Sequence, residues 1–298
     1  MKIALILVPF HLSKEKIGMG MGPIRYIEAG IDQNLKDQGY EVMVKKIKLL
    51  KQYKDEVRTI AVLNNSLGKV VKRVLRDGFF PFILGGNCNT CLGILAGFDE
   101  PKPGIIWFDA HGDFNTPKTT PSGFFDGMGL AIATGQCYQD IYSIIENMRP
   151  IKESQTLHIG ARDLDPEELE LLESTEVLMV NANTLKKTGI VNGLLPKLTE
   201  LYSQTQEVYL HIDIDVIDPS EAPGVDFPAP EGLFLSEMEE AIKLISENLQ
   251  IKAAALTAYN PEKDVDNKTL MIGLKLTNTI LGIVANQTEN NNNGKMVK

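Results

Sequence analysis

Two short segments of the sequence place carboxylates and imidazoles at alternate positions. The first runs from Asp109 through His111 to Asp113, and the second contains Asp213 and Asp215. In extended chain, alternate residues point to the same side, and neighbouring carboxylates repel each other unless a cation neutralises them. Ligand sets of carboxylate and imidazole favour manganese, iron, cobalt or zinc. The spacing therefore predicts a divalent transition-metal site, whereas a single aspartate would favour a turn or a helix cap.

A third candidate is Cys88, which follows the apolar run 79–84 and two glycines. Cys88 and Cys91 form a C-x-x-C pair, a spacing also found in redox-active dithiols and zinc sites. The size of the surrounding segment does not match a thioredoxin unit, and no second pair supplies further zinc ligands. Taken alone, the pair favours two small buried cysteines.

The elements that must position these residues alternate along the chain. Apolar runs predict eight strands, at 2–8, 41–47, 79–84, 104–108, 156–159, 176–180, 208–212 and 251–256. Amphipathic stretches predict helices at 23–35, 57–76, 90–96, 166–173, 185–203, 235–248 and 269–285, with Asp165 capping the helix at 166. Alternating strands and helices predict a parallel sheet covered on both faces, which binds ligands beyond the carboxyl ends of its strands.

Length and composition limit the classes of protein. The chain has 298 residues, a net charge of −9 and 43% hydrophobic residues, with no shift in composition that would divide it. We expect one domain over 1–286 and a polar C-terminal tail over 287–298. The acidic balance argues against nucleic acid or an anionic membrane as partner. Three cysteines cannot form a disulfide framework, no segment reaches the length of a bilayer span, and we expect a cytoplasmic protein.

Three motifs carry a resemblance to a known family. They are D-A-H-G-D-F-N-T-P-K-T-T-P-S-G at 109–123, I-G-A-R-D-L-D-P at 159–166 and D-I-D-V-I-D-P-S-E-A-P at 213–223. With them the chain resembles the ureohydrolase (arginase/agmatinase) family. The resemblance implies an α/β fold of three αβα layers around an eight-stranded parallel sheet. It also implies two manganese ions per subunit, although another divalent transition metal would suit the same ligands.

The resemblance also implies a role for each ligand. Asp109 and Asp213 would bridge the two ions, Asp113 would complete one ion, and His111 with Asp215 would complete the other. The family has a histidine in G-G-D-H where this chain has Cys88 in G-G-N-C, so Cys88 stands at a ligand position.

The pattern of the arginase branch implies a substrate with an amino-acid end. Asn115, Thr120 and Ser122 match residues that contact an α-carboxylate, and Asp163 and Asp165 match the region that meets an α-amino group. The alternative is that the Asn-Thr-Pro and Ser-Gly segments only form turns.

Two positions depart from the arginase pattern. Asp126 replaces the histidine assigned to proton shuttling, and Ala258 replaces the glutamate that holds the guanidinium. The Nω-hydroxy-L-arginine amidinohydrolases resemble this chain more closely, because they also have Cys at the ligand position and no shuttle histidine. Ala258 departs from this subgroup as well.

Three other residues near these motifs have simpler interpretations. We interpret Trp107 and His158 as core residues and His211 as a residue that orients a ligand carboxylate.

Together these observations predict a binuclear-metal hydrolase. It would cleave a C–N bond of a guanidino or amidino group, a linear amidine, on a small amino-acid-like substrate such as Nω-hydroxy-L-arginine. A hydroxide bridging the metals would attack, with Asp113 and Asp126 as catalytic residues. The main alternative is a catalytically silent metal-binding member of the family. A nucleotide-binding loop at Gly18, Gly20 and Gly22 does not fit G-x-G-x-x-G, and a homo-oligomer is expected from the family.

Overall fold

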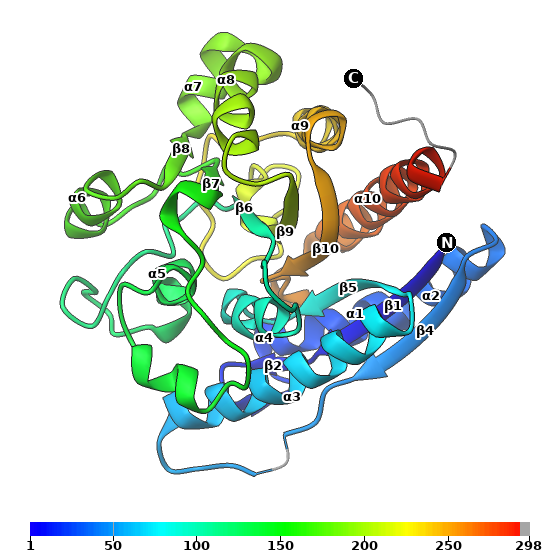
Figure 1. Cartoon of the computed structure of the whole chain (residues 1–298), viewed down its shortest axis with the longest axis horizontal. Coiled ribbons are helices and arrows are strands. Elements are labelled where there is room, and N and C mark those ends of the chain that lie inside the picture. Colours follow the sequence, from blue (N-terminus) through cyan, green and yellow to red (C-terminus); the bar gives the residue numbers. More distant parts are fainter. Residues whose placement is uncertain (50, 293–298) are drawn as a thin grey trace.

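The computed structural model describes residues 1–49 and 51–292, and these residues form a central parallel sheet (Figure 1). Its eight strands all pair in parallel. The predicted eight-stranded parallel sheet is therefore confirmed. In spatial order the strands are β4 (Glu41–Lys46), β1 (Lys2–Val8), β5 (Phe80–Gly85), β10 (Gln250–Thr257), β9 (Glu207–Asp213), β6 (Gly104–Phe108), β7 (Thr156–Ile159) and β8 (Leu178–Val180). A short antiparallel pair, β2 (Phe10–His11) and β3 (Lys14–Glu15), lies outside this sheet.

Helices cover both faces of the sheet, as alternation along each strand requires. In β1, Ile3 and Leu5 join one buried cluster, while Ala4 and Ile6 join the other. The first cluster includes side chains of α1 (Gly22–Glu28), α2 (Ile31–Asp37), α7 (Ala182–Thr188), α8 (Ile190–Tyr202), α9 (Leu235–Asn248) and α10 (Lys268–Asn292). The second includes side chains of α3 (Glu56–Arg76), α4 (Cys91–Ala96), α5 (Gly129–Thr134) and α6 (Pro166–Glu173). The three-layer αβα architecture is confirmed.

Several helices differ from the predicted ranges. Glycines at positive φ divide two predicted helices: Gly30, at 81°, separates α1 from α2, and Gly189, at 79°, separates α7 from α8. These backbone angles favour glycine, because it has no Cβ to clash. The short α5 is not predicted, and α10 continues to Asn292, beyond the predicted 269–285. Within the predicted polar tail, residues 293–298 lie outside the described part of the chain.

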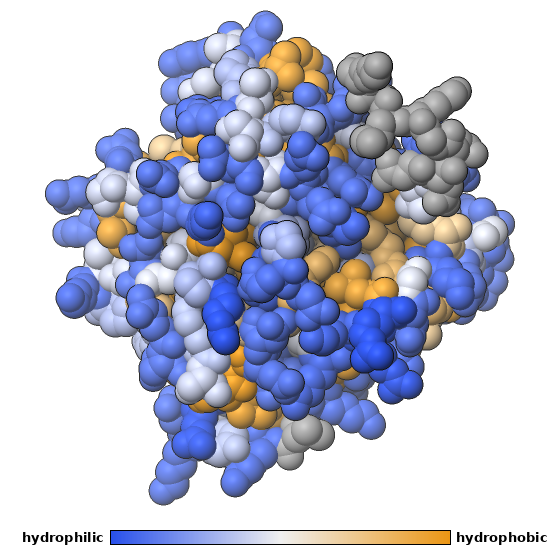
Figure 2. All heavy atoms as spheres, in the orientation of Figure 1, coloured by the Kyte–Doolittle hydropathy of each residue, from blue (hydrophilic) through white to orange (hydrophobic). Residues whose placement is uncertain are grey.

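From the sequence we expect no segment that could span a bilayer. One helix contradicts this expectation, since it is long enough and apolar enough to do so. Residues 265–290 form a helical segment whose most apolar window has a mean hydropathy of 1.3, and half of that window is buried. The buried residues Leu276, Ile280 and Val284 recur at intervals of four and face the core, as in a helix that covers a sheet. Figure 2 shows a mostly hydrophilic surface with scattered apolar groups.

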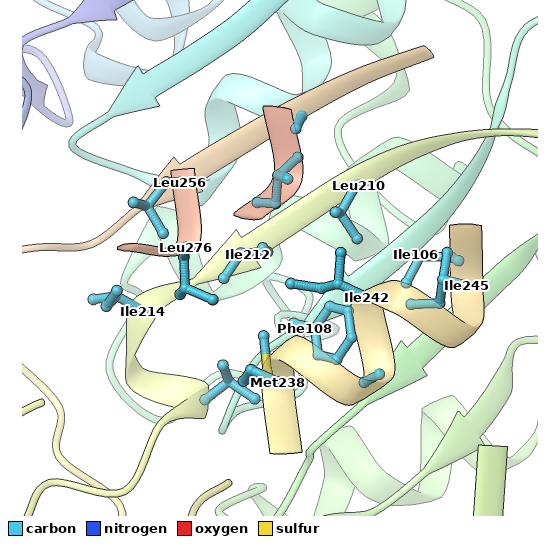
Figure 3. Packing of buried hydrophobic residues seen from close by; sticks show 14 of the residues in the cluster. Ile106, Phe108, Leu210, Ile212, Ile214, Met238, Ile242, Ile245, Leu256 and Leu276 are labelled. Carbon is cyan, nitrogen blue, oxygen red and sulfur yellow. The ribbon is translucent and has the colours of Figure 1, made fainter. Parts of the chain in front are cut away.

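The central strands pack against α9 and α10 on the first face. Phe108 of β6 lies between Met238 and Ile242 of α9, Leu210 of β9 lies on the side of Ile242, and Leu276 of α10 lies beside Ile212 of β9 (Figure 3). These side chains are almost completely removed from water. Because β6 and β9 carry the two carboxylate segments at their ends, this packing fixes where those segments lie.

Shortening a central core side chain should destabilise the protein strongly. Leu210→Ala removes buried methyl groups and leaves a cavity, so we expect a loss of about 2–5 kcal/mol in the free energy of unfolding, measured by urea denaturation. Val191 is 43% exposed, so Val191→Ala should cost far less. Equal losses in the two variants would contradict this packing.

The second face of the sheet carries a row of aromatic and imidazole side chains. Trp107 of β6 pairs in register with His158 of β7 and with His211 of β9. All three are fully buried, and the rings of Trp107 and His211 stack with centroids 3.6 Å apart. Burial lowers the pKa of His158 to about 4 and the pKa of His211 well below its ordinary value. Both imidazoles are therefore neutral at neutral pH, and the interpretation of Trp107 and His158 as core residues agrees with their burial.

This burial makes stability depend on pH with a definite sign. Below about pH 6.5 an unfolded histidine binds a proton, whereas folded His158 stays neutral down to about pH 4. The unfolded state then binds more protons, so the contribution of His158 is complete above pH 6.5 and is lost as pH falls towards 4. In His158→Met, the loss of unfolding free energy between pH 6.5 and 5 should be smaller by about 2 kcal/mol.

The measurement is urea denaturation of metal-free protein at both pH values. Leu210→Ala serves as the control, because it lowers stability without removing a titrating group and should keep the wild-type pH dependence. An unchanged pH dependence in His158→Met would show that His158 is already protonated in the folded protein at pH 5.

Candidate metal centre

Turns at one edge of the sheet bring together the residues that the sequence singles out. Cys88 follows β5, Asp109 and His111 follow β6, Asp213 ends β9 and Asp215 follows it. Two sets of these side chains offer ligand atoms within 4.8 Å of one another. The first set is Cys88, Asp109 and Asp213, and the second is Asp109, His111 and Asp215. Asp109 belongs to both sets, as a residue shared by two ions would.

Short contacts hold each set together. The Cys88 Sγ lies 2.9 Å from Asp213 Oδ2, and His111 Nδ1 lies 3.1 Å from Asp215 Oδ2 and 3.4 Å from Asp109 Oδ1. Backbone groups fix the carboxylates: the amide of His111 donates to Asp109 Oδ1 at 2.7 Å, and the amide of Asp215 donates to Asp213 Oδ1 at 2.9 Å. The alternation of the sequence thus lets each segment orient its own carboxylates.

Asp113 lies at the same cleft but belongs to neither set. Its backbone adopts a left-handed conformation, with φ of 47°, which aspartate tolerates better than most residues. The amides of Leu130 and Ala131, in the first turn of α5, donate to its carbonyl oxygen and hold this conformation. Its carboxylate oxygen Oδ2 is buried without a hydrogen-bond partner among the described residues. Such an atom is costly unless a ligand satisfies it.

Crowding of buried acids perturbs their protonation. Burial and then the charge of Asp215 raise the pKa of Asp109 to about 6. Burial, together with neighbouring carboxylates, raises the pKa values of Asp113 and Asp213 well above their ordinary value. Burial disfavours a charged His111, but the carboxylates of Asp215 and Asp109 outweigh it and raise its pKa to about 12. Without other cations, protons must neutralise this cluster.

The donor set fits a pair of divalent transition-metal ions. Three buried carboxylates, an imidazole and a thiol converge, and an unpaired oxygen of a fourth buried carboxylate, that of Asp113, lies at the same cleft. Metal binding requires the deprotonated forms of these groups, so ions would replace the protons that the crowded site otherwise needs. A buried thiol that donates to Asp213 would release its proton in the same way.

Asp126 organises the turn that carries Cys88. Its side chain accepts hydrogen bonds from the backbone amides of Cys88, at 3.2 Å, and Asn89, at 2.8 Å. It also accepts from the side-chain amides of Asn87 and Asn89. Burial raises the pKa of Asp126 although these bonds oppose the shift. Asp126 is 5% exposed, so it is not a solvated loop carboxylate. Its catalytic role stays a prediction, and these contacts favour positioning.

Three further residues support the site, and the sequence analysis assigns them no such role. Trp107 Nε1 donates to Asp109 Oδ2 at 3.0 Å, and Arg162 donates to the carbonyl oxygen of Asp215 at 2.7 Å. Glu168 accepts from the amides of the segment after β6, at Phe114 and Asn115. Only Glu168 has a local sequence signal, because it stands three residues after Asp165 as the partner in a capping box. Asp165 occupies the predicted N-cap position, and its amide donates to Glu168 Oε2 at 3.3 Å.

The candidate centre lies in a cleft of about 450 Å³. Eight acidic residues line it, and none of its described lining residues is lysine or arginine. The lining acids are Asp113, Asp126, Asp163, Asp165, Glu168, Asp213, Asp215 and Asp226. A cleft of this charge attracts cations and repels free anions.

All five residues predicted to contact substrate line this cleft. Asn115 donates to Asp165 Oδ2 at 2.9 Å, while Thr120 and Ser122 accept from the amides of residues 123 and 124 at an exposed turn. Asp163 is exposed at the mouth. The turn alternative for Thr120 and Ser122 agrees with these bonds, and contact with a substrate stays a prediction for all five.

Other lining residues narrow the cleft. Phe124 and Phe227 pack with ring centroids 5.5 Å apart, and Phe227 meets the edge of His111 at 6.2 Å. Ala258, which follows β10, adds only a methyl group to the wall and has φ of 64°. Asp226 is already paired, since Lys263 Nζ lies 2.8 Å from its carboxylate. Asp226 is therefore not a free carboxylate that could replace the one that Ala258 lacks.

Two alternatives from the sequence find little support. Neither set of ligand atoms includes Cys91, whose Sγ lies 3.7 Å from the carbonyl oxygen of Gly129 among apolar side chains. Added Cβ atoms at Gly20 and Gly22 would meet the backbone of His11 at 2.8 Å and of Tyr259 at 2.4 Å. These two glycines therefore permit close backbone packing, which explains them without a nucleotide.

Comparison with known proteins matches the chain over nearly all of its length. The model of the arginase family matches residues 1–282. The arginase of Bacillus caldovelox is 30% identical over 292 residues, covering 94% of this chain and 98% of that protein. The arginase of Bacillus subtilis (strain 168) is 30% identical over 290 residues, covering 94% and 97%. A solved structure of the Bacillus caldovelox arginase aligns with a TM-score of 0.86 over 94% of this chain and 98% of that one, at 30% identity. The chain therefore belongs to the arginase family.

Proposed function

We propose that this protein is a metal-dependent hydrolase of a C–N bond in a linear amidine, acting on a guanidino or amidino group of an amino-acid-like substrate. The observation that carries the proposal is that two sets of ligand atoms share Asp109, and that the other members of these sets, Cys88, His111, Asp213 and Asp215, line an acidic cleft. Relatives over nearly the whole chain are named arginase, which supports the same class of reaction.

The residues that would hold the ions are those of the two sets together with Asp113, which belongs to neither set, divided between the ions as the family resemblance implies. Cys88, Asp109, Asp113 and Asp213 would hold one ion, and His111 and Asp215 would join Asp109 and Asp213 around the other. When bound, two such ions make water more acidic and polarise the amidine. The chain keeps the ligands oriented through Trp107, Arg162 and backbone amides. Manganese is the first metal to test, because carboxylate and imidazole suit it.

Asp113 and Asp126 have different roles in this proposal. Asp113 Oδ2 is buried and unpaired among the described residues, so this oxygen is placed to take a proton from water and return it to the leaving amine. Asp126 holds the Asn87–Asn89 turn through four hydrogen bonds, and in this proposal it positions Cys88 rather than moving a proton.

The wall at Ala258 favours a less basic amidine than arginine. A guanidinium at this wall would face a methyl group instead of a carboxylate partner at position 258, and a buried charge without a close partner is costly. Nω-Hydroxy-L-arginine is less basic and so depends less on such a partner. The exposed carboxylate of Asp163 and that of Asp165 line the same cleft and suit an ammonium group at the other end of the substrate. A homo-oligomer and a cytoplasmic location stay predictions.

The test of activity uses purified protein loaded with Mn²⁺ or Co²⁺ and four substrates: arginine, Nω-hydroxy-L-arginine, agmatine and formiminoglutamate. We expect the highest kcat/KM for Nω-hydroxy-L-arginine, measured by release of urea, hydroxyurea or, for formiminoglutamate, formamide, with activity lost on chelation. Asp113→Asn should lower kcat by about 10²–10⁴-fold, whereas Asp140→Asn, at an exposed residue outside the cleft, should not. Stable metal binding without turnover of any amidine would select the catalytically silent alternative.

Restoring a carboxylate at Ala258 should shift preference towards arginine. Ala258→Glu would supply a counter-ion for the guanidinium, so we expect kcat/KM for arginine to rise at least about tenfold relative to Nω-hydroxy-L-arginine. Ala258→Gln has nearly the same shape and the same strain at positive φ, but no charge, and it should not cause this shift. Equal effects of Glu and Gln would show that charge at this wall does not determine preference.

A further inference from the structure

A column of buried polar side chains runs beneath the candidate metal centre and ends at the sulfur of Cys88. The Tyr209 hydroxyl lies 2.7 Å from His211 Nδ1, and His211 Nε2 lies 3.4 Å from Thr257 Oγ1. Thr257 Oγ1 lies 3.1 Å from Cys88 Sγ. All four residues are at most 2% exposed, so water cannot replace these contacts. The expectation that His211 orients a ligand carboxylate is therefore wrong: its ring contacts Tyr209 and Thr257 instead.

The topology of the sheet builds this column. Tyr209 and His211 occupy alternate positions of β9, so they share a face. Thr257 ends β10, which lies between β9 and β5, and the turn that follows β5 carries Cys88. Ala255 is the register partner of His211, and its small side chain lets the larger groups fill this face. Side chains from β9 and β10 thus meet the sulfur carried by the turn after β5.

The donors and acceptors of the column favour one direction. A neutral imidazole has one N–H and one acceptor nitrogen. Among the described residues, the Tyr209 hydroxyl has its hydrogen bond to His211 Nδ1 and no other. If Nδ1 carried the proton, the buried Tyr209 proton would have no acceptor, which is costly. Tyr209 therefore donates to Nδ1, and His211 Nε2–H donates to Thr257 Oγ1.

Thr257 is left with one hydroxyl proton and two acceptors in reach. The carbonyl oxygen of Ile212 and the Cys88 Sγ each lie 3.1 Å away. While Cys88 is a thiol, its proton goes to Asp213 Oδ2 at 2.9 Å, and the Thr257 proton can go to Ile212. Once the sulfur is a thiolate, it becomes the stronger acceptor because it is charged. The Thr257 hydroxyl can then turn to the sulfur without any movement of the backbone.

We propose that Thr257 and His211 are positioning residues that place a hydrogen bond on the Cys88 sulfur and so set how strongly it binds a metal ion. This inference rests on the proposed function in taking Cys88 as a ligand. Hydrogen bonds to ligand atoms commonly change metal affinity by 10–100-fold. Here the Thr257 hydroxyl would offset the negative charge of the Cys88 thiolate. A neutral histidine in place of Cys88 would not bring that charge.

Cobalt binding tests this role without any measurement of turnover. A thiolate bound to Co²⁺ gives a sulfur-to-cobalt charge-transfer band in the near ultraviolet. The single tryptophan, Trp107, donates to Asp109, so quenching of its fluorescence reports Co²⁺ binding. In Thr257→Val, the sulfur loses its hydrogen bond. We expect the band to move to longer wavelength and the Kd for Co²⁺ to rise about tenfold.

Matched variants separate this effect from a general loss of packing. Thr257→Ser keeps the hydroxyl and should retain the wild-type band. Thr277→Val changes a fully buried threonine of α10, which bonds its own helix, and should leave both band and Kd unchanged. His211→Phe keeps a ring against Trp107 and should move the band in the same direction as Thr257→Val, by less. This variant gives a second test if Thr257→Val does not fold.

The outcomes distinguish the inference from the proposed function. A wild-type band that persists unchanged in Thr257→Val and His211→Phe would overturn the positioning role while leaving the hydrolase proposal intact. A band that is absent in the wild type, or that remains in Cys88→Ser, would show that Cys88 is no ligand and would overturn the positioning role with it. Lack of turnover together with the expected band shifts would count against the proposed hydrolase function and would support the positioning role of Thr257 and His211.

Discussion

The repulsion among buried carboxylates at one edge of the sheet is the constraint on which the rest of the site depends. Asp109, Asp213 and Asp215 are nearly inaccessible to water, where a charge is poorly solvated and neighbouring charges interact strongly. The raised pKa values of Asp109 and Asp213 and the protonated His111 are ways in which the metal-free site meets this constraint. Cations meet it better, because they bind the ionised forms and remove the repulsion. The fold therefore makes sense as a scaffold that stabilises an arrangement unfavourable by itself.

Rigid neighbours are what prevent these carboxylates from moving apart. The amide of His111 donates to Asp109, and the amide of Asp215 donates to Asp213, each within its own segment. The buried Trp107 indole also donates to Asp109. Behind them, β6 and β9 are packed against α9. A site of this kind can be held in place only by a core that does not relax, since relaxation would let each carboxylate reach water. The packing that stabilises the core therefore also holds the carboxylates of the cleft in place.

The sequence predicts the sheet and the ligand edge well because both follow from local patterns. Runs such as 3–8 are apolar throughout, which is typical of strands buried on both faces, and the carboxylate segments stand at the ends of such runs. Asp215 itself lies in a 3-10 turn after β9, not in the strand. Breaks at Gly30 and Gly189 were not predictable in this way, since the helical pattern continues on both sides of each glycine, and the six residues of α5 are too few to show a period. The partners of Asp126 and of His211 lie in other parts of the chain. Such contacts depend on strand order and register, and no spacing in the sequence carries that information.

The positions that depart from the arginase pattern gather around one side of the cleft, and charge explains why they would change together. Four carboxylates and a thiolate carry five negative charges, one more than two divalent ions balance, whereas a histidine at the position of Cys88 would bring none. Asp126 draws the amides of the Cys88 turn onto its own carboxylate, so those donors are unavailable to the sulfur. The hydroxyl of Thr257 is then the donor left in reach of the sulfur among the described residues. The methyl group of Ala258 adds no further negative charge to this excess. The thiol of Cys88, the hydroxyl of Thr257 beside it and the methyl group of Ala258 are in this way consistent parts of one electrostatic arrangement.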